Sequence, residues 1–293
     1  MEPVLITGAD GFVGAHLRAL LGDSAIAAEV DVLDRAAVCH AVRAARPRRV
    51  VHLAAESSVA SSWQDPPATW LVNVIGTVNV LEVVREEQPG ARVLFASTGE
   101  VYGRTDQLPT PESAPPSPLS PYAATKAAAE IACRQSARGG LDVVIARAFN
   151  TEGPGRDERF ALGSWAHQIA RLEEAGGGVL AVGDLSAERD ITDVRDVCGA
   201  YTLMLDEAVE AGTYNVASGR GVPMSDVVEL FISLARCPVE VEQRDDRVRP
   251  VEIPRMVGDA SRLREASGWQ PEIPLEQTVA DMLEAVRAAR SVA

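Results

Sequence analysis

The chain has 293 residues, 46% of them hydrophobic, so it can bury the core of one large domain or of two modest ones. Its formal net charge of −14 argues against binding to nucleic acids or to anionic membranes. The four cysteines are scattered with no CxxC pair, so we expect neither a disulfide framework nor a metal site. Without a basic leader or an apolar run of ~20 residues, the protein is predicted to be soluble and cytoplasmic.

Apolar strands alternate with helical segments through the first half of the chain. Strands are predicted at 3–7, 49–55, 91–98 and 141–150, and helices at 12–22, 35–46, 73–87 and 121–138. Strands that are apolar throughout and separated by helices indicate a parallel sheet covered on both faces. The sequence therefore predicts an α/β fold with a Rossmann-type doubly wound parallel sheet.

After about residue 150 the regular alternation ends, and loops rich in glycine and proline separate the helices. The segment 212–219 has the pattern of one more sheet strand, so the chain is expected to return to the first domain. We therefore assign residues 1–150, with a return segment at about 190–217, to a Rossmann domain. Residues 151–189 and 218–293 are assigned to a smaller C-terminal lobe that binds the substrate.

Three glycines follow the first predicted strand in the segment TGADGFVG. Gly8, Gly11 and Gly14 have the spacing GxxGxxG between a strand and a helix. Such a turn directs free backbone N–H groups and the positive end of the helix toward a phosphate. The glycines let a pyrophosphate approach the backbone, where Phe12 and Val13 contribute main-chain atoms. Glycines also serve tight turns alone, but in this context the loop predicts dinucleotide binding.

Between the first two helices, the segment 24–34 has room for only one strand. If this strand is the second of the sheet, Glu29 or Asp31 could bond the adenosine ribose, which would favour NAD. If it is the third, Asp31 would face the adenine, and the element that separates NAD from NADP is nearly missing. The sequence therefore leaves both NAD and NADP open as the cofactor.

Lys126 is the only lysine among 28 lysine and arginine residues. It follows Tyr122 by four residues on a predicted helix, so both side chains project from the same face. A nearby ammonium favours the phenolate and lowers the pKa of a tyrosine, which suits acid–base catalysis. A lysine also reaches ribose hydroxyls that the wide fork of arginine would not suit. We interpret Tyr122 and Lys126 as a redox pair rather than as ordinary residues of a surface helix.

These motifs together resemble the extended short-chain dehydrogenase/reductase family. The matching features are the GxxGxxG opening, a strand ending in Ser/Thr, YxxxK, and the segments HLAAESSV, NVIGTVNVLE, FASTGEVYG, ARAFNTEGPG, ERDITDVRDV and YNVASG. Within the family, the chain is most similar to the nucleotide-sugar epimerases, dehydratases and reductases, and above all to the GDP-4-keto-6-deoxymannose reductases. The resemblance implies a nucleotide-diphosphate-sugar substrate and a homodimer formed through the helices that carry Tyr122 and Asn73.

The resemblance also implies roles for individual residues. Thr98 would hydrogen-bond the sugar hydroxyl or ketone beside Tyr122, and Asn73 would be a structural hydrogen-bonding residue at a helix start. Along the cofactor we expect Asp31 at the adenine together with Leu53, Ala54 and Ala55. At the substrate diphosphate, where arginine forks suit the two phosphates, we expect Asn150, Arg189 and Arg249. The two arginines could instead form surface ion pairs.

The segment STGEVYG bears on the reaction. A sugar 4,6-dehydratase needs a base for the C5 proton and an acid for the leaving hydroxyl. Glu100 is a candidate base or a structural residue, and Gly99 leaves the position of the acid without a side chain. We therefore expect reduction of the C4 ketone of a nucleotide-linked 4-keto-6-deoxyhexose, with a GDP link favoured. The alternatives are a 4,6-dehydratase or 4-epimerase with tightly bound NAD and, more remotely, a non-catalytic dinucleotide sensor.

Overall fold

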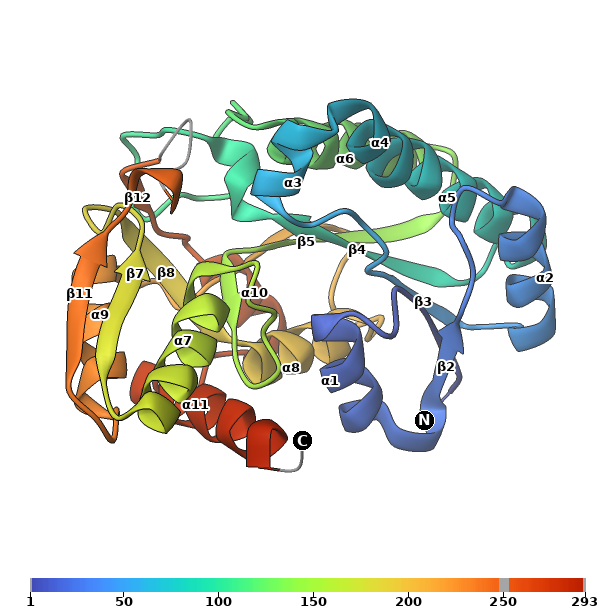
Figure 1. Ribbon diagram of the computed structural model, residues 1–293. Coiled ribbons are helices and arrows are strands. Elements are labelled where there is room, and N and C mark those ends of the chain that lie inside the picture. The colour runs from blue at the N-terminus through green and yellow to red at the C-terminus, as the bar shows by residue number, and fades with distance from the viewer. Residues whose placement is uncertain (1, 248–252, 292–293) are drawn as a thin grey trace.

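Six parallel strands form the main sheet of the computed structural model, which describes residues 2–247 and 253–291 (Figure 1). The strand order is β2-β1-β3-β4-β5-β9, with every neighbouring pair parallel. The predicted doubly wound sheet is therefore confirmed, and the strand expected at 212–219 does return to it. The strands are β1 (Val4–Thr7), β2 (Ala25–Ala28), β3 (Arg49–His52), β4 (Arg92–Thr98), β5 (Asp142–Ala148) and β9 (Gly212–Val216).

Helices cover both faces of this sheet, because successive residues of a strand point to opposite sides. Val4 and Ile6 belong to the core on one face, whereas Leu5 between them belongs to the core on the other. The first face is covered by α1 (Phe12–Leu21), α8 (Val194–Met204) and α10 (Ser261–Ser267). The second face, uppermost in Figure 1, is covered by α2 (Arg35–Ala45), α5 (Gly76–Glu87) and α6 (Pro121–Arg138).

The helix predicted at 73–87 begins earlier than expected. α4 (Pro66–Trp70), the π-helical turn η2 (Leu71–Ile75) and α5 follow one another without a break, so Asn73 lies inside a helical run and not at its start. By length and composition this run could cross a membrane, contrary to the expectation that no segment would. However, 44% of its most apolar window is buried inside the protein, as in a core helix of a folded domain.

A separate hydrophobic core lies beside the main sheet, at the left of Figure 1. Its helices are α7 (Ala161–Ala175), α9 (Met224–Ser233) and α11 (Leu275–Ser291). The strands outside the main sheet are β6 (Asn150–Glu152), β7 (Gly178–Val182), β8 (Glu188–Asp193), β10 (Gly221–Pro223), β11 (Val239–Gln243) and β12 (Arg255–Met256). β8 pairs here with β6, β10 and β12, whereas β9 joins the main sheet. The assignment of residue ranges to two lobes stays a prediction.

Short elements complete the connections between these layers. They are α3 (Val59–Gln64) and the 3₁₀ turns η1 (Gly22–Ser24), η3 (Gly99–Tyr102) and η4 (Asp245–Arg247).

A buried ion pair anchors α6 on the sheet. The carboxylate of Glu130 is fully buried and accepts from Arg147 through Nε at 2.8 Å and Nη2 at 2.6 Å. It also accepts from the hydroxyl of Ser97 at 2.6 Å. Ser97 precedes Thr98 on β4, and Glu130 lies one helical turn after Lys126 on α6. The network therefore holds β4 and α6 in a fixed relation directly beside the predicted catalytic residues.

Candidate active site

The predicted site residues gather at one edge of the main sheet. β2 and β3 lie on opposite sides of β1, so the strand order switches at β1, where open α/β sheets bind their ligands at the carboxyl ends. Gly8 follows β1, the segment 53–55 follows β3, and Thr98 ends β4. Residues far apart in the sequence are thus brought to the same edge by the parallel arrangement.

The glycine loop needs its small residues to pass close to neighbouring backbone. A Cβ on Gly8, whose φ is +69°, would lie 2.7 Å from the nitrogen of Ala54, and one on Gly14 would lie 2.4 Å from the oxygen of Gly8. Within the described residues, the Gly11 N-cap of α1 makes no side-chain cap hydrogen bond, so N–H groups of the first turn stay available to a ligand. The loop therefore fits a dinucleotide pyrophosphate. The contacts assigned to Phe12 and Val13 stay predictions.

The segment 24–34 forms a single strand, β2, which pairs with β1 at the edge of the sheet. This is the arrangement of the first alternative, in which the strand is second in the sheet. Asp31 lies beyond its carboxyl end, is exposed, and accepts a hydrogen bond from the nitrogen of Leu33 at 2.9 Å. Whether Glu29 or Asp31 meets the ribose, or Asp31 the adenine, stays a prediction.

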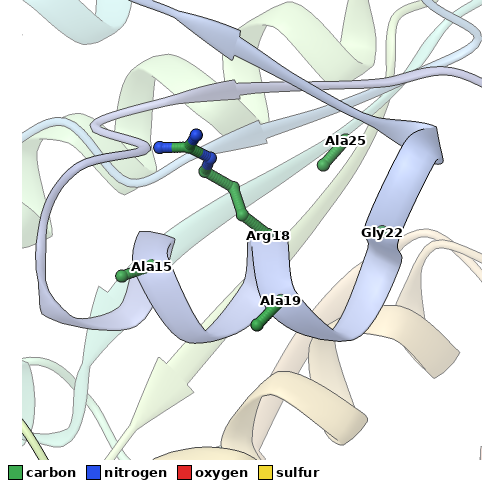
Figure 2. A pocket seen from close by; sticks show the side chains of 5 residues that line it. All are labelled: Ala15, Arg18, Ala19, Gly22 and Ala25. Atoms are coloured by element: carbon green, nitrogen blue, oxygen red, sulfur yellow. The ribbon is translucent and has the colours of Figure 1, made fainter.

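A hollow on the outer side of α1 does not coincide with this edge (Figure 2). It is lined by Ala15, Arg18, Ala19, Gly22 and Ala25. The Arg18 side chain extends across it and pairs with Asp10 of the glycine loop at 2.7 Å. The predicted site residues do not line this hollow, so we do not assign the substrate to it.

Tyr122 is held in place through its own backbone. Its N–H donates to the hydroxyl of Ser62 at 3.1 Å, and its carbonyl accepts from the hydroxyl of Thr125 at 2.7 Å. The side chain of Thr98 lies close enough to the Tyr122 hydroxyl to lower its pKa. The structure therefore brings together Thr98 and Tyr122, which the sequence predicts to act on the same oxygen.

The pKa of Tyr122 lies well above its ordinary value. Burial of the phenol is the main cause, followed by the negative charge of Glu100, and Glu56 adds to the effect. The side chain of Thr98 and the positive charge of Arg156 lower the pKa of Tyr122, but by less. Tyr122 is consequently a protonated phenol at neutral pH, and Glu100 lies close enough for its charge to be felt there.

Lys126 lies buried beneath Tyr122, against the ring of Phe95. Its Nζ lies 4.6 Å from the centroid of the Phe95 ring, and its side chain is buried. Burial lowers the pKa of Lys126 to about 8. Among the described residues, the cation that lowers the Tyr122 pKa most is Arg156. The expected lowering of that pKa by Lys126 stays a prediction. Its contact with the ribose stays a prediction.

A hydrogen-bonded chain beneath the glycine loop fixes the state of His52. Nε2 of His52 lies 3.0 Å from the hydroxyl oxygen of Thr77, whose proton is donated to the carbonyl of Asn73 at 2.6 Å. Nε2 must therefore carry the proton, and Nδ1 accepts from Thr7 at 2.7 Å. Burial, followed by the nearby charge of Lys126, lowers the pKa of His52 to about 3. His52 is thus a neutral structural residue.

This lowered pKa predicts a loss of stability in mild acid. The unfolded chain binds a proton at its ordinary histidine pKa of about 6.5, whereas the folded chain does so only near 3. Stability contributed by neutral His52 is therefore present above about pH 6.5 and declines as the pH falls toward 3, by ~2 kcal/mol between pH 7 and pH 5. Urea unfolding of the wild type and of His52→Gln across this range checks the prediction. Equal pH slopes for the two proteins would contradict it.

The predicted substrate-binding residues have different surroundings. Asn150 begins β6, and its Oδ1 is buried without a hydrogen-bond partner among the described residues, as expected of a group that awaits a ligand. Arg189 is buried on β8, and its Nη1 donates to the carbonyls of Glu188 at 2.9 Å and Ile253 at 2.7 Å. Arg249 lies outside the described residues. All three assignments stay predictions.

Two charged side chains near Tyr122 were missed by the sequence analysis. Glu56 and Arg156 both shift the pKa of Tyr122, so both lie near its hydroxyl. Glu56 follows the segment that is predicted to pass along the cofactor, and Arg156 lies in the loop after β6, directly after the motif that carries Asn150. The motifs around them could have drawn attention to both. No cluster of metal-ligating residues occurs within residues 2–247 and 253–291.

The family follows from comparison with known proteins. The family model described as GDP-mannose 4,6 dehydratase matches residues 21–282. The chain belongs to this family. It is 34% identical to the GDP-6-deoxy-D-mannose reductase of Pseudomonas aeruginosa, over 96% of both chains. It is 28% identical to the GDP-6-deoxy-D-talose 4-dehydrogenase of Aggregatibacter actinomycetemcomitans, over 90% of this chain and 91% of that one.

Solved structures confirm the fold and its class of cofactor. The structure of RMD from Pseudomonas aeruginosa, in complex with NADPH, has a TM-score of 0.91 and 33% identity over 99% of this chain and 100% of that one. The UDP-glucose 4-epimerase of Thermus thermophilus, in complex with NAD, has a TM-score of 0.87 and 30% identity over 98% and 99% of the two chains. The chain is thus an enzyme of the extended short-chain dehydrogenase/reductase type that uses NAD or NADP.

Proposed function

We propose that this protein reduces the C4 ketone of a GDP-linked 4-keto-6-deoxyhexose with NADPH or NADH. The observation that carries the proposal is the place of Tyr122 beside Thr98 at the end of β4, held there through its backbone, with a raised pKa that keeps its phenol protonated. A ketone reduction needs a proton donor at its oxygen, which this phenol supplies at neutral pH. The similarity to a GDP-6-deoxy-D-mannose reductase along nearly the whole chain supports the same reaction.

Each residue of the site has a definite task in this reaction. The cofactor, when bound at the glycine loop, supplies the hydride for C4. Tyr122 donates its proton to the C4 oxygen, and the hydroxyl of Thr98 orients and polarises that oxygen. Asn150 offers a buried acceptor to the nucleotide sugar. Lys126 lies one turn after Tyr122, where it can reach the cofactor ribose once its ammonium moves from Phe95.

Gly99 favours a reductase over a dehydratase. A Cβ at this position would lie 2.9 Å from three atoms of the Phe149 ring, so a side chain here would require that buried ring to shift. The position at which a dehydratase would hold its acid thus has no side chain and little room for one. Glu100 keeps its two interpretations, as a C5 base or as a structural residue. A 4,6-dehydratase or a 4-epimerase with bound NAD remains the second candidate.

The proposed reaction predicts the fate of the hydride. We would incubate the protein with GDP-4-keto-6-deoxymannose and with NADPH or NADH that carries deuterium at the transferable position, and analyse the product by mass spectrometry and NMR. The reductase proposal predicts a GDP-6-deoxyhexose with deuterium at C4. A parallel reaction with GDP-mannose tests the dehydratase alternative, which predicts conversion to the keto sugar without added cofactor. That result, with no C4 label from the first reaction, would sink the reductase proposal.

We propose that the protein is a cytoplasmic homodimer that binds neither nucleic acid nor membrane. Large apolar side chains are exposed on two helices in mutual contact: Trp70 at the end of α4, Leu71 and Ile75 on η2, and Ile131 on α6. Leu71 is 51% exposed and Ile131 67%, and such a gathered patch is typical of a protein interface. The acidic net charge disfavours a nucleic acid or an anionic membrane there.

The dimer proposal is checked by mass. We expect the wild type to elute at twice the chain mass in size-exclusion chromatography with light scattering. Substitution of both Leu71 and Ile131 by glutamate is expected to give a monomer. The dimer would otherwise have to bury two added carboxylates from each subunit without partners of opposite charge. Val241→Glu on β11, also an exposed apolar residue, is the control and should leave the mass unchanged. A monomeric wild type at micromolar concentration would refute the proposal.

A further inference from the structure

Arg156 is clamped in the loop between β6 and α7. Its guanidinium lies 3.6 Å from the centroid of the Phe160 ring and 4.8 Å from that of Phe12. Nε faces the carboxylate of Glu152 at 3.4 Å, and both side chains are largely buried, at 16% and 5% exposed. Contacts with two aromatic rings and one carboxylate restrict the position of the guanidinium.

The loop that carries Arg156 is itself fastened to both sides of the site. His16 of α1 bonds the carbonyl of Pro154 through Nε2 at 2.8 Å, so the loop is tied to the helix that begins at the glycine loop. On the other side, a Cβ on Gly163 of α7 would lie 2.2 Å from the carbonyl oxygen of Asp157. The position of Arg156 is therefore set by the fold and is not that of a free surface side chain.

The donor edge of Arg156 is free to meet a ligand. Within residues 2–247 and 253–291, Nε has no hydrogen-bond partner, and no hydrogen bond joins either Nη group to the protein. The cation is also held against Phe12, the first residue of α1, where the helix dipole is positive. The positive charge of Arg156 and the positive end of α1 repel each other unless an anion lies between them. The positive charge of Arg156 also lowers the pKa of Tyr122, so the guanidinium lies in the neighbourhood of the phenol.

We propose that Arg156 binds a phosphate of the diphosphate that lies between the glycine loop and Tyr122. The proposal rests on the proposed function, which places two diphosphate esters in this region, the cofactor and the nucleotide sugar. Phe12 and Phe160 restrict the guanidinium, and Glu152 pairs with it beside Nε, which leaves both Nη groups to meet phosphate oxygens in the fork geometry that suits them. Arg156, with Phe12 and Phe160, would thus bind the phosphate between the glycine loop and α7.

The test measures binding without turnover. Dissociation constants for NADPH and NADH come from fluorescence titration, and that for GDP from calorimetry, with wild type, Arg156→Gln and Arg156→Lys. We expect Arg156→Gln to weaken at least one of these ligands ~10- to 100-fold, with partial recovery in Arg156→Lys. A loss for the reduced cofactors assigns Arg156 to their pyrophosphate, and a loss for GDP assigns it to the substrate diphosphate.

Two further variants separate ligand binding from folding. Arg159→Gln removes an exposed arginine of the same loop that pairs with Asp157, and it should change no dissociation constant more than twofold. Glu152→Gln/Arg156→Gln leaves no unpaired carboxylate in the interior, so it should fold and still bind as weakly as Arg156→Gln. Unchanged constants in this double variant, for every ligand that the wild type binds, would overturn the proposal. These binding measurements need no turnover. A wild type that binds the cofactor but reduces no ketone would therefore refute the proposed reductase function and leave the phosphate-binding role of Arg156 intact.

Discussion

Replacing Tyr122 with phenylalanine is expected to lower kcat for ketone reduction by ~10²- to 10⁴-fold, the range found when a positioned acid is removed. The Tyr122 hydroxyl beside Thr98 is the proton donor of the proposed reaction, and phenylalanine has no proton to give. The backbone bonds of Tyr122 to Ser62 and Thr125 do not involve the side-chain hydroxyl, so the helix should stay in place. The dissociation constant of the reduced cofactor is expected to change little.

Steady-state kinetics and cofactor titration measure these two effects separately. Tyr214→Phe is the matched control, because its hydroxyl donates to the carbonyl of Glu210 just before β9, away from the carboxyl ends of the strands. It should keep full activity. If Tyr122→Phe reduced the ketone as fast as the wild type did, the phenol would not be the acid, and the proposed mechanism would be wrong.

Replacing Arg147 with methionine is expected to lower the free energy of unfolding by ~3–5 kcal/mol, because it leaves the buried carboxylate of Glu130 without its main partner. Arg147 is 1% exposed and makes two hydrogen bonds to that carboxylate, and its guanidinium lies 4.7 Å from the centroid of the Tyr102 ring. Methionine can fill much of the same space but carries no charge. Urea unfolding at neutral pH measures the loss.

Arg134→Gln provides the control for this network. Arg134 bonds the same carboxylate at 2.6 Å, but its side chain is 39% exposed, so we expect a loss of no more than ~1 kcal/mol. If Arg147→Met and Arg134→Gln were equally stable, burial of the arginine would not determine how much its ion pair with Glu130 contributes to stability. The network also links Ser97 to α6, so Arg147→Met should lower kcat as well, through the position of Thr98 relative to Tyr122.

The main sheet could be predicted because its strands are short and apolar throughout, and such segments are buried most readily as strands covered by helices on both faces. Residues 121–138 were predicted as a helix, and α6 has those bounds, with Ser120 at its N-cap and Gly139 at its end. The glycine spacing, together with the strand and helix beside it, predicted the turn. The start of the helix before α5 was missed, because it depends on Asp65 and Pro66 and on the π-helical turn, which have no apolar period.

The site was predicted less completely, because charges act through space and not through sequence spacing. Tyr122 and Lys126 do share a face of α6, yet the ammonium lies over Phe95 of β4, a contact that depends on how helix and sheet pack. Arg156 acts on Tyr122 from a loop more than thirty positions away in the chain, so no local pattern could have paired them. The glycine loop was found because its glycines, the strand before them and the helix after them follow one another directly in the sequence.

The most direct test of the account is the consumption of reduced nicotinamide by the purified protein in the presence of GDP-4-keto-6-deoxymannose. We would follow the absorbance of NADPH and of NADH, and determine by denaturation how much cofactor the protein already carries. We expect one molecule of NADPH or NADH to be consumed for each molecule of keto sugar. Without the keto sugar, we expect no consumption of either cofactor. Tightly bound NAD in stoichiometric amount, with no net consumption of either reduced cofactor, would contradict the reductase and indicate an internal redox cycle.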